Sequence, residues 1–266
     1  MFGRRNGRAY ECVGIDLNTQ RDFCEPGGLY PVVNLDRLIP AVQSVVTWLK
    51  RNRVPVISSV ESHRRWEVPK DGKPILCCID GSMGQRKLDF TLLTSRMYVE
   101  ADNTLAVPTD LFHHSHQVIF RKRTDDLLAN PKADRFLTHL PVKEFIVFGN
   151  GLECSVKALV LGLLTRSKRV QVVLDACGYW DFATADLAVR QMAAKGAEMT
   201  TVAQLLLRRV ARRVRIATPG GSDSNGNGNG ASNNGQSALS TPQTLDGLRK
   251  LLDSLPESRM PSSGAT

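Results

Sequence analysis

Short apolar runs alternate with segments of helical periodicity along most of this chain. The apolar runs predict buried strands, because consecutive Val, Ile, Leu and Phe residues suit a sheet that is covered on both faces. We expect strands at residues 12–17, 54–60, 117–120, 145–148, 170–174 and 198–201. Apolar residues three and four positions apart predict helices at residues 34–50 (interrupted at Pro40), 131–140, 156–164, 181–195 and 202–213. Strands separated by helices indicate right-handed crossovers. The expected fold is therefore α/β, a three-layer αβα sandwich with a mainly parallel central sheet.

One strand, turn and helix in this pattern form a typical mount for a nucleophile. The strand expected at residues 145–148 leads into a glycine-containing turn and then into a helix. A side chain at such a turn stands at the end of the sheet, and free N–H groups at the start of the helix can hold an oxyanion. Two candidates are adjacent there, Cys154 and Ser155. Which of them occupies the mounted position decides which chemistry the chain can perform.

The composition of the chain changes after Arg215. Residues 219–236 are almost entirely Gly, Ser, Asn and Asp, which cannot bury enough apolar surface to become ordered. Residues 244–255 have the pattern of one short amphipathic helix. We therefore expect a folded domain at residues 10–216, a disordered linker at 217–243 and a helical tail at 244–266. The tail is either a marginal helix or a docking segment for a partner.

Charge and cysteine content narrow the class of protein. The 266 residues carry a formal net charge of +9, and five arginines cluster at positions 208, 209, 212, 213 and 215. A solvated helix face explains this cluster better than a nucleic-acid site, because no aromatic residues are interleaved. The six cysteines follow neither a disulfide framework nor a zinc-binding spacing. Without a signal peptide or a membrane-spanning apolar run, we expect a cytoplasmic protein with reduced thiols.

Four further segments carry recognisable motifs. Residues 16–23 read Asp-Leu-Asn-Thr-Gln-Arg-Asp-Phe, and the strand expected near residue 60 continues to Glu-Ser-His at residues 61–63. Residues 77–84 read Cys-Cys-Ile-Asp-Gly-Ser-Met-Gly, and residues 121–131 begin Arg-Lys-Arg and end Asn-Pro. Together with the nucleophile mount, these segments resemble the isochorismatase-like family of cysteine hydrolases, which includes nicotinamidases. The resemblance covers about residues 10–206. It implies a small-molecule ligand, hydrolysis of amide or vinyl-ether bonds, and assembly into homo-oligomers.

The resemblance also implies where the catalytic triad of Asp, Lys and Cys would lie. In this family the cysteine thiolate attacks a carbonyl, the aspartate transfers protons, and the lysine lowers the pKa of both. Lys122 matches the lysine. Aligned through the Gln-x-Asp-Phe that ends at residue 23, Asn18 stands where the aspartate belongs. Aligned through the glycine, glutamate and Val-Lys of the mount, Ser155 stands where the cysteine belongs, and Cys154 takes the variable position before it.

These replacements change the expected chemistry. An asparagine amide has no site that takes a proton at neutral pH, and a serine hydroxyl needs a base to become a nucleophile. The favoured interpretation is a pseudoenzyme-like member that binds a small molecule. The alternative is an active, nicotinamidase-like amidohydrolase that uses Lys122, Ser155 or Cys154, and Asp16 as base. Asp16 lies two residues before Asn18 on the expected strand, so both side chains would share one face.

The metal site of nicotinamidases is altered as well. The resemblance implies a divalent ion held by Asp-x-His and a second His, and the matching residues here are Glu61, His63 and Cys77. Carboxylate, imidazole and thiolate are all zinc ligands. A zinc site is thus a candidate, although the changed set of only three groups favours an empty site.

Overall fold

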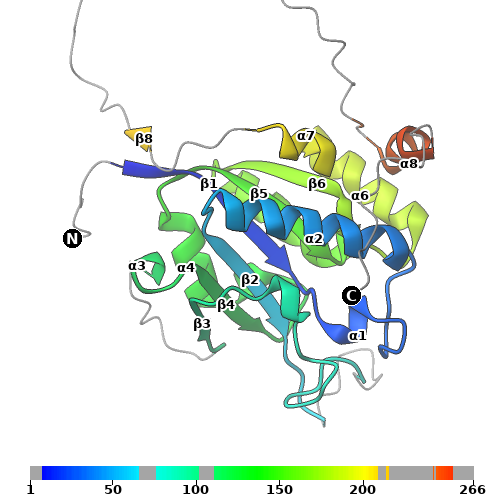
Figure 1. Ribbon diagram of the computed structural model, residues 1–266, viewed down its shortest axis with the longest axis horizontal. Helices are drawn as coiled ribbons and strands as arrows, with labels where there is room; N and C mark the ends of the chain where they lie inside the picture. Colours follow the sequence, from blue (N-terminus) through cyan, green and yellow to red (C-terminus); the bar gives the residue numbers. More distant parts are fainter. Residues whose placement is uncertain are drawn as a thin grey trace, which may run out of the picture.

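Seven parallel strands form the central sheet of the protein (Figure 1). The computed structural model describes residues 8–65, 76–101, 111–208, 214–215, 242 and 244–253. The strands are β1 (Arg8–Leu17), β2 (Val56–Glu61), β3 (Arg96–Val99), β4 (Gln117–Lys122), β5 (Val142–Asn150), β6 (Arg169–Gly178) and β7 (Glu198–Thr200). Their order across the sheet is β3-β4-β2-β1-β5-β6-β7, with every neighbouring pair parallel. A short eighth strand, β8 (Val214–Arg215), pairs antiparallel with the start of β1.

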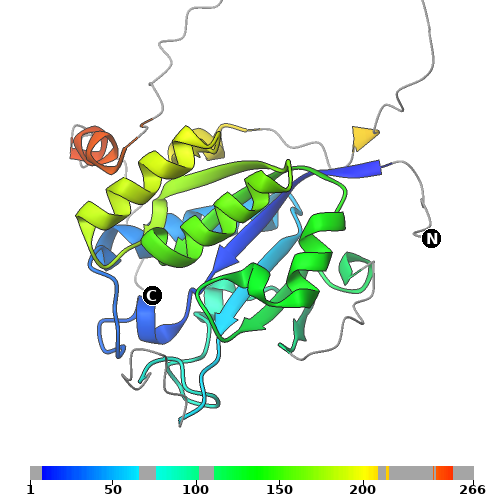
Figure 2. The same ribbon diagram turned by 180° about the vertical axis from the view of Figure 1, so that it is seen from behind.

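Helices cover both faces of this sheet, as the alternating pattern predicts. The helices are α1 (Arg21–Cys24), α2 (Leu35–Arg51), α3 (Leu111–His114), α4 (Pro131–His139), α5 (Lys157–Thr165), α6 (Phe182–Ala194), α7 (Val202–Leu206) and α8 (Leu245–Asp253). Helices α2 and α7 lie on one face, and α4, α5 and α6 lie on the other (Figures 1 and 2). Single turns occur at Asp89–Thr91, Leu127–Ala129 and Leu152–Val156. The expected three-layer αβα sandwich is confirmed.

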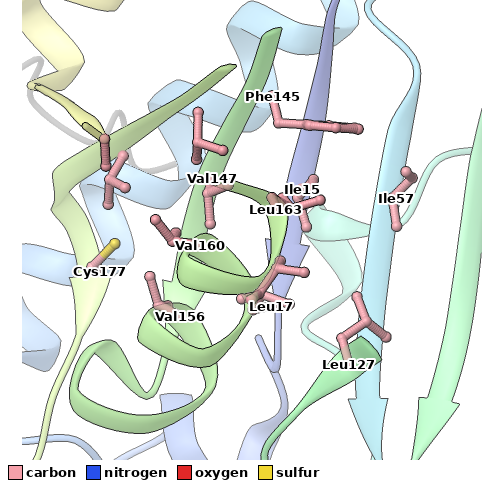
Figure 3. Close-up of a cluster of buried hydrophobic side chains, with 14 of the residues drawn as sticks. Ile15, Leu17, Ile57, Leu127, Phe145, Val147, Val156, Val160, Leu163 and Cys177 are labelled. Atoms are coloured by element: carbon pink, nitrogen blue, oxygen red, sulfur yellow. The ribbon is translucent and has the colours of Figure 1, made fainter. Parts of the chain in front are cut away.

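Two apolar layers fill the space between the sheet and its helices. Figure 3 shows Leu17 of β1 and Val147 of β5 in the same layer as Val160 and Leu163 of α5, and all four side chains are completely buried. On the opposite face of β1, Gly14 lies so close to α2 that an added Cβ would be 2.9 Å from the Leu49 Cδ1 atom. Odd-numbered residues of β1 therefore face α5, and even-numbered residues face α2, as the two-residue period of a strand requires.

Several elements differ from the sequence-based expectation. Helix α2 continues through Pro40. Proline has no N–H to bond the carbonyl four residues earlier, but Pro40 is exposed, so water can reach that carbonyl instead. Strand β3 was not expected, since it is an edge strand with alternating exposure and lacks an apolar run. The last helix of the domain ends at Leu206 instead of continuing to residue 213.

The ends of the chain are only partly described. Arg208 is ion-paired with Glu144 and bonds the Gln171 side chain at 2.9 Å, so for this arginine the expected solvated helix face is wrong. Arg209, Arg212 and Arg213 and most of the expected linker lie outside the described residues. The expected tail helix forms as α8 and packs against α6. Within the described part, no helix is long and apolar enough to span a membrane.

Candidate functional site

Four neighbouring strands bring four polar side chains together at their carboxyl ends. Asn18 directly follows β1, Glu61 ends β2, Lys122 ends β4 and Ser155 lies in the turn after β5. These strands are adjacent in the sheet, and ligands of open α/β sheets bind beyond the carboxyl ends of the strands. All four side chains are buried. We call these four residues the Lys122 cluster.

The Lys122 ammonium lies at the centre of this cluster. Its Nζ atom is 2.9 Å from Glu61 Oε1 and 3.2 Å from Ser155 Oγ. It also donates to the backbone carbonyls of Thr124 at 2.9 Å and Asp125 at 3.1 Å. A buried charge needs such partners, because an unpaired ammonium is costly to remove from water. Lys122 and Ser155 are therefore in contact, as the sequence motifs predicted.

Asn18 joins the cluster through an unusual backbone conformation. Its φ of 49° is left-handed, a region that Asn enters more readily than most residues. Asn18 Nδ2 donates to Glu61 Oε1 at 2.7 Å and to Ser155 Oγ at 3.1 Å, while Asn18 Oδ1 accepts from Ser59 Oγ at 2.7 Å. An ionised carboxylate only accepts hydrogen bonds, so Glu61 fixes which end of the amide points into the cluster.

Asp16 lies in a separate buried network. Its carboxylate is 2.9 Å from Lys87 Nζ and accepts from Thr19 Oγ1 at 2.8 Å and Ser58 Oγ at 3.2 Å. The expectation that Asp16 and Asn18 share one face is wrong in this respect. The left-handed turn at Asn18 breaks the alternation of the strand, so Asn18 turns toward Lys122 while Asp16 stays on the α2 side.

Two glycines shape the turn that carries Ser155. Gly149 and Gly151 have φ values of 114° and 80°, and a Cβ added to Gly149 would lie 2.1 Å from the Leu17 carbonyl oxygen. The turn at Leu152–Val156 is a single π-helical turn, designated η3, which leads into α5. The N–H groups of Cys154 and Val156 donate to the Gly151 carbonyl at 3.1 and 2.8 Å. These two N–H groups are thus already bonded and are not free to hold an oxyanion.

The turn presents Ser155, rather than Cys154, to Lys122. Ser155 is 1% exposed, whereas Cys154 is partly exposed and its Sγ atom lies 4.0 Å from Ser155 Oγ. Burial, with a further contribution from the Asp125 charge, raises the pKa of the Cys154 thiol to about 11. The thiol is therefore protonated at neutral pH and a poor nucleophile.

Glu61 was expected as a metal ligand, not as a member of this cluster. Burial alone would raise the pKa of its carboxyl, but the charge of Lys122 and the hydrogen bond of His63 outweigh burial and lower that pKa to about 2. Glu is one methylene longer than the Asp of the family motif, and this length was the sequence signal for its reach into the site. One carboxylate oxygen, Oε1, serves both Lys122 and Asn18.

The three residues of the candidate zinc set, Glu61, His63 and Cys77, are not grouped as a metal site among the described residues. Glu61 Oε2 and His63 Nε2 are 3.4 Å apart, but Glu61 Oε1 is engaged by Lys122 and Asn18. Cys77 is partly exposed. A hydrogen bond from the Cys78 thiol lowers the pKa of Cys77, against the effect of burial. Among the residues that the structure describes, no three His, Cys, Asp or Glu side chains are grouped to hold a metal ion. These residues do not fit a nicotinamidase-type metal site.

Comparisons with known proteins agree with this fold. Residues 13–204 match the family model described as the isochorismatase domain. The structure is similar to the zinc complex of Pyrococcus horikoshii pyrazinamidase, with a TM-score of 0.56 and 20% identity over 72% of this chain and 99% of that one. An isochorismatase-like hydrolase from Alkaliphilus metalliredigens gives a TM-score of 0.59 and 14% identity, over 74% and 97% of the two chains. Nicotinamidase from Bacillus subtilis gives 0.59 and 13%, over 71% and 99%. No curated protein matches the sequence.

Proposed function

Because this chain belongs to the isochorismatase family, we propose that it is a non-hydrolysing member that binds a small molecule at the Lys122 cluster. The observation that carries this proposal is the set of neighbours around Ser155 Oγ. Asn18 Nδ2 and Lys122 Nζ face it as hydrogen-bond donors, at 3.1 and 3.2 Å, and together they occupy its two acceptor lone pairs. No acceptor within the described residues is placed to receive the hydroxyl proton, which a serine nucleophile must lose.

The groups that might replace the missing base do not support hydrolysis. Glu61 is the nearest carboxylate, but it bonds Lys122 and Asn18, and a pKa of about 2 makes it a weak base. Asp16, the base of the alternative amidohydrolase, is held by Lys87 in its own buried network. Cys154, the alternative nucleophile, has a protonated thiol beside the cluster. Active hydrolysis is therefore the less supported of the two functions.

The chemistry of the Lys122 cluster suggests small carboxamides as first ligands. A carboxamide carries both a hydrogen-bond acceptor and a donor, which complement an ammonium and a carboxylate respectively. Pyrazinamidase and nicotinamidase are also named among the structural neighbours. This support concerns the ligand class and not an individual compound.

Binding and turnover of nicotinamide and pyrazinamide test the proposal. We expect calorimetry to detect binding to the wild type, and we expect Lys122→Ala to weaken it at least about tenfold, since a charge-assisted hydrogen bond is lost. Lys143→Ala, at a half-exposed surface position, serves as the matched control and should bind like the wild type. Release of ammonia that depends on Lys122 would contradict the proposal.

A further inference from the structure

Helix α8 is attached to the domain through a small but specific contact with α6. Leu245 and Leu248, one turn apart on α8, are 4% and 5% exposed and belong to the same apolar cluster as residues of α6. The backbone N–H of Leu245 donates to Asp186 Oδ1 at 2.9 Å. Figures 1 and 2 both show α8 beside α6. The start of α8 is thus anchored by both apolar and polar contacts.

A long stretch of sequence separates α8 from the rest of the domain. Strand β8 ends at Arg215 beside the start of β1, and α8 begins at Leu245. The intervening sequence contains the Gly-, Ser- and Asn-rich residues 219–236, which lie outside the described part. Such a connection keeps a segment at high effective concentration, so a contact that is weak between separate molecules persists within one chain.

The helix that receives α8 is connected to the nucleophile turn. The backbone N–H groups of Trp180 and Asp181 donate to Glu153 Oε1 at 2.7 and 3.1 Å. Asp181 caps the start of α6 by accepting from the N–H of Thr184 at 2.8 Å. Glu153 lies in η3, two residues before Ser155. The first turn of α6 and the turn that mounts Ser155 are therefore held together through one carboxylate.

Helix α8 also lies near the loop of residues 179–181, which connects β6 to α6. Tyr179 begins the loop and Phe182 follows it, and both pack against the apolar cluster that contains Leu245 and Leu248. The positive charge of Arg249 lowers the pKa of Tyr179, against the larger rise caused by burial. Undocking α8 would thus remove Leu245 and Leu248 from the apolar cluster against which Tyr179 and Phe182 pack, and would remove a nearby positive charge.

We propose that the α6 surface around Asp186 is a docking site for the chain's own α8. Docking then holds residues 179–182 against Glu153 and thereby fixes the position of Ser155. The occupant is α8 of the same molecule. The docking does not depend on whether the Lys122 cluster hydrolyses its ligand. Its failure and the failure of the proposed function are therefore distinguishable.

Hydrogen exchange on the full-length protein tests this coupling. The variant Leu245→Asp/Leu248→Asp removes the apolar contact, and Lys250→Ser, at an exposed position of the same helix, is the matched control. We expect the double variant to exchange about tenfold faster in residues 152–156 and 179–186, while the control matches the wild type. Leu248→Ala should give a smaller change of the same kind, which separates undocking from misfolding.

Two results would overturn the proposal. One is unchanged exchange in residues 152–156 when α8 itself exchanges faster in the double variant, because the loop would then be independent of docking. The other concerns the occupant. The molar mass in solution should be the same for the wild type and the double variant, and a mass that falls in the variant would mean that α8 docks on a second copy.

Discussion

The carboxylate beside Lys122 comes from Glu61 at the end of β2, and not from position 18 after β1. The family's triad places an aspartate at position 18, but here Asn18 donates to Glu61, which reaches in from β2. The sequence motifs placed Asn18, Lys122 and Ser155 correctly at one site. The extra methylene of Glu61 signals a longer reach, but the motifs do not give the direction of its side chain, which depends on contacts between strands that are far apart in sequence. The motifs also misplaced Asp16, because nothing in the motif signals the left-handed backbone at Asn18.

Restoring the aspartate should therefore conflict with Glu61. In Asn18→Asp, a second carboxylate replaces the amide that now lies 2.7 Å from Glu61 Oε1. We expect the free energy of unfolding at pH 7 to fall by about 2 kcal/mol, because like charges share a buried site. Adding Glu61→Gln should recover part of this loss, and urea denaturation of all four proteins of the cycle measures the coupling. Additive effects would show that the two side chains do not compete.

Asp175 provides a pH-dependent prediction at the residue scale. Burial raises the pKa of its carboxyl to about 6, although hydrogen bonds from the Val202 N–H at 2.9 and 3.1 Å oppose the rise. A raised carboxyl pKa means that the folded state binds the proton more tightly, so the protein loses stability as pH rises from about 4 to above 6. We expect Asp175→Asn to increase the free energy of unfolding at pH 8 by up to about 3 kcal/mol. Because the carboxylate is only half-buried, screening by solvent lowers this gain in stability. The gain should vanish near pH 4, and urea denaturation at both pH values checks this.

At the scale of elements, the apolar pattern identified six of the seven parallel strands but not their full lengths. Strand β5, for example, was expected at residues 145–148 and spans Val142–Asn150. The ends of β5 pair with β1 and β6 through backbone hydrogen bonds, which leave no trace in the apolar pattern. The turn after β5 was expected to lead directly into a helix. Its π-helical form depends on Gly151 at φ 80°, a conformation that the sequence permits but does not specify.

The Gly151 turn is expected to be intolerant of a side chain. A Cβ at this position would lie 2.6 Å from Cys154 Sγ, in addition to the cost of a left-handed backbone. Gly196, with φ 97° and open space around it, is the matched control that carries only the backbone cost. We expect Gly151→Ala to lower the free energy of unfolding by about 2–4 kcal/mol, and Gly196→Ala by about 1 kcal/mol. Equal losses in thermal or urea denaturation would show that the contact with Cys154 is not significant.

At the scale of the whole molecule, the sheet positions the site and α8 extends the support around it. The parallel order β4-β2-β1-β5 explains why residues from positions 18 to 155 meet at one edge. Alternating strands and helices predicted this architecture, and the family motifs predicted that Asn18, Lys122 and Ser155 lie close together. The sequence predicted either a marginal helix or a docking segment for a partner at the position of α8. Packing of α8 on α6 was not predicted, because an amphipathic pattern does not identify the surface that covers it.

The most direct test of the account is the fate of a bound carboxamide. Stoichiometric wild-type protein and nicotinamide are incubated for many hours, and the ligand is then recovered and identified by mass spectrometry, with Ser155→Ala in parallel. A binder whose Ser155 hydroxyl has no base should return the carboxamide intact from both proteins, with no more acid than buffer alone produces. Conversion to the carboxylic acid by the wild type, but not by Ser155→Ala, would contradict the account.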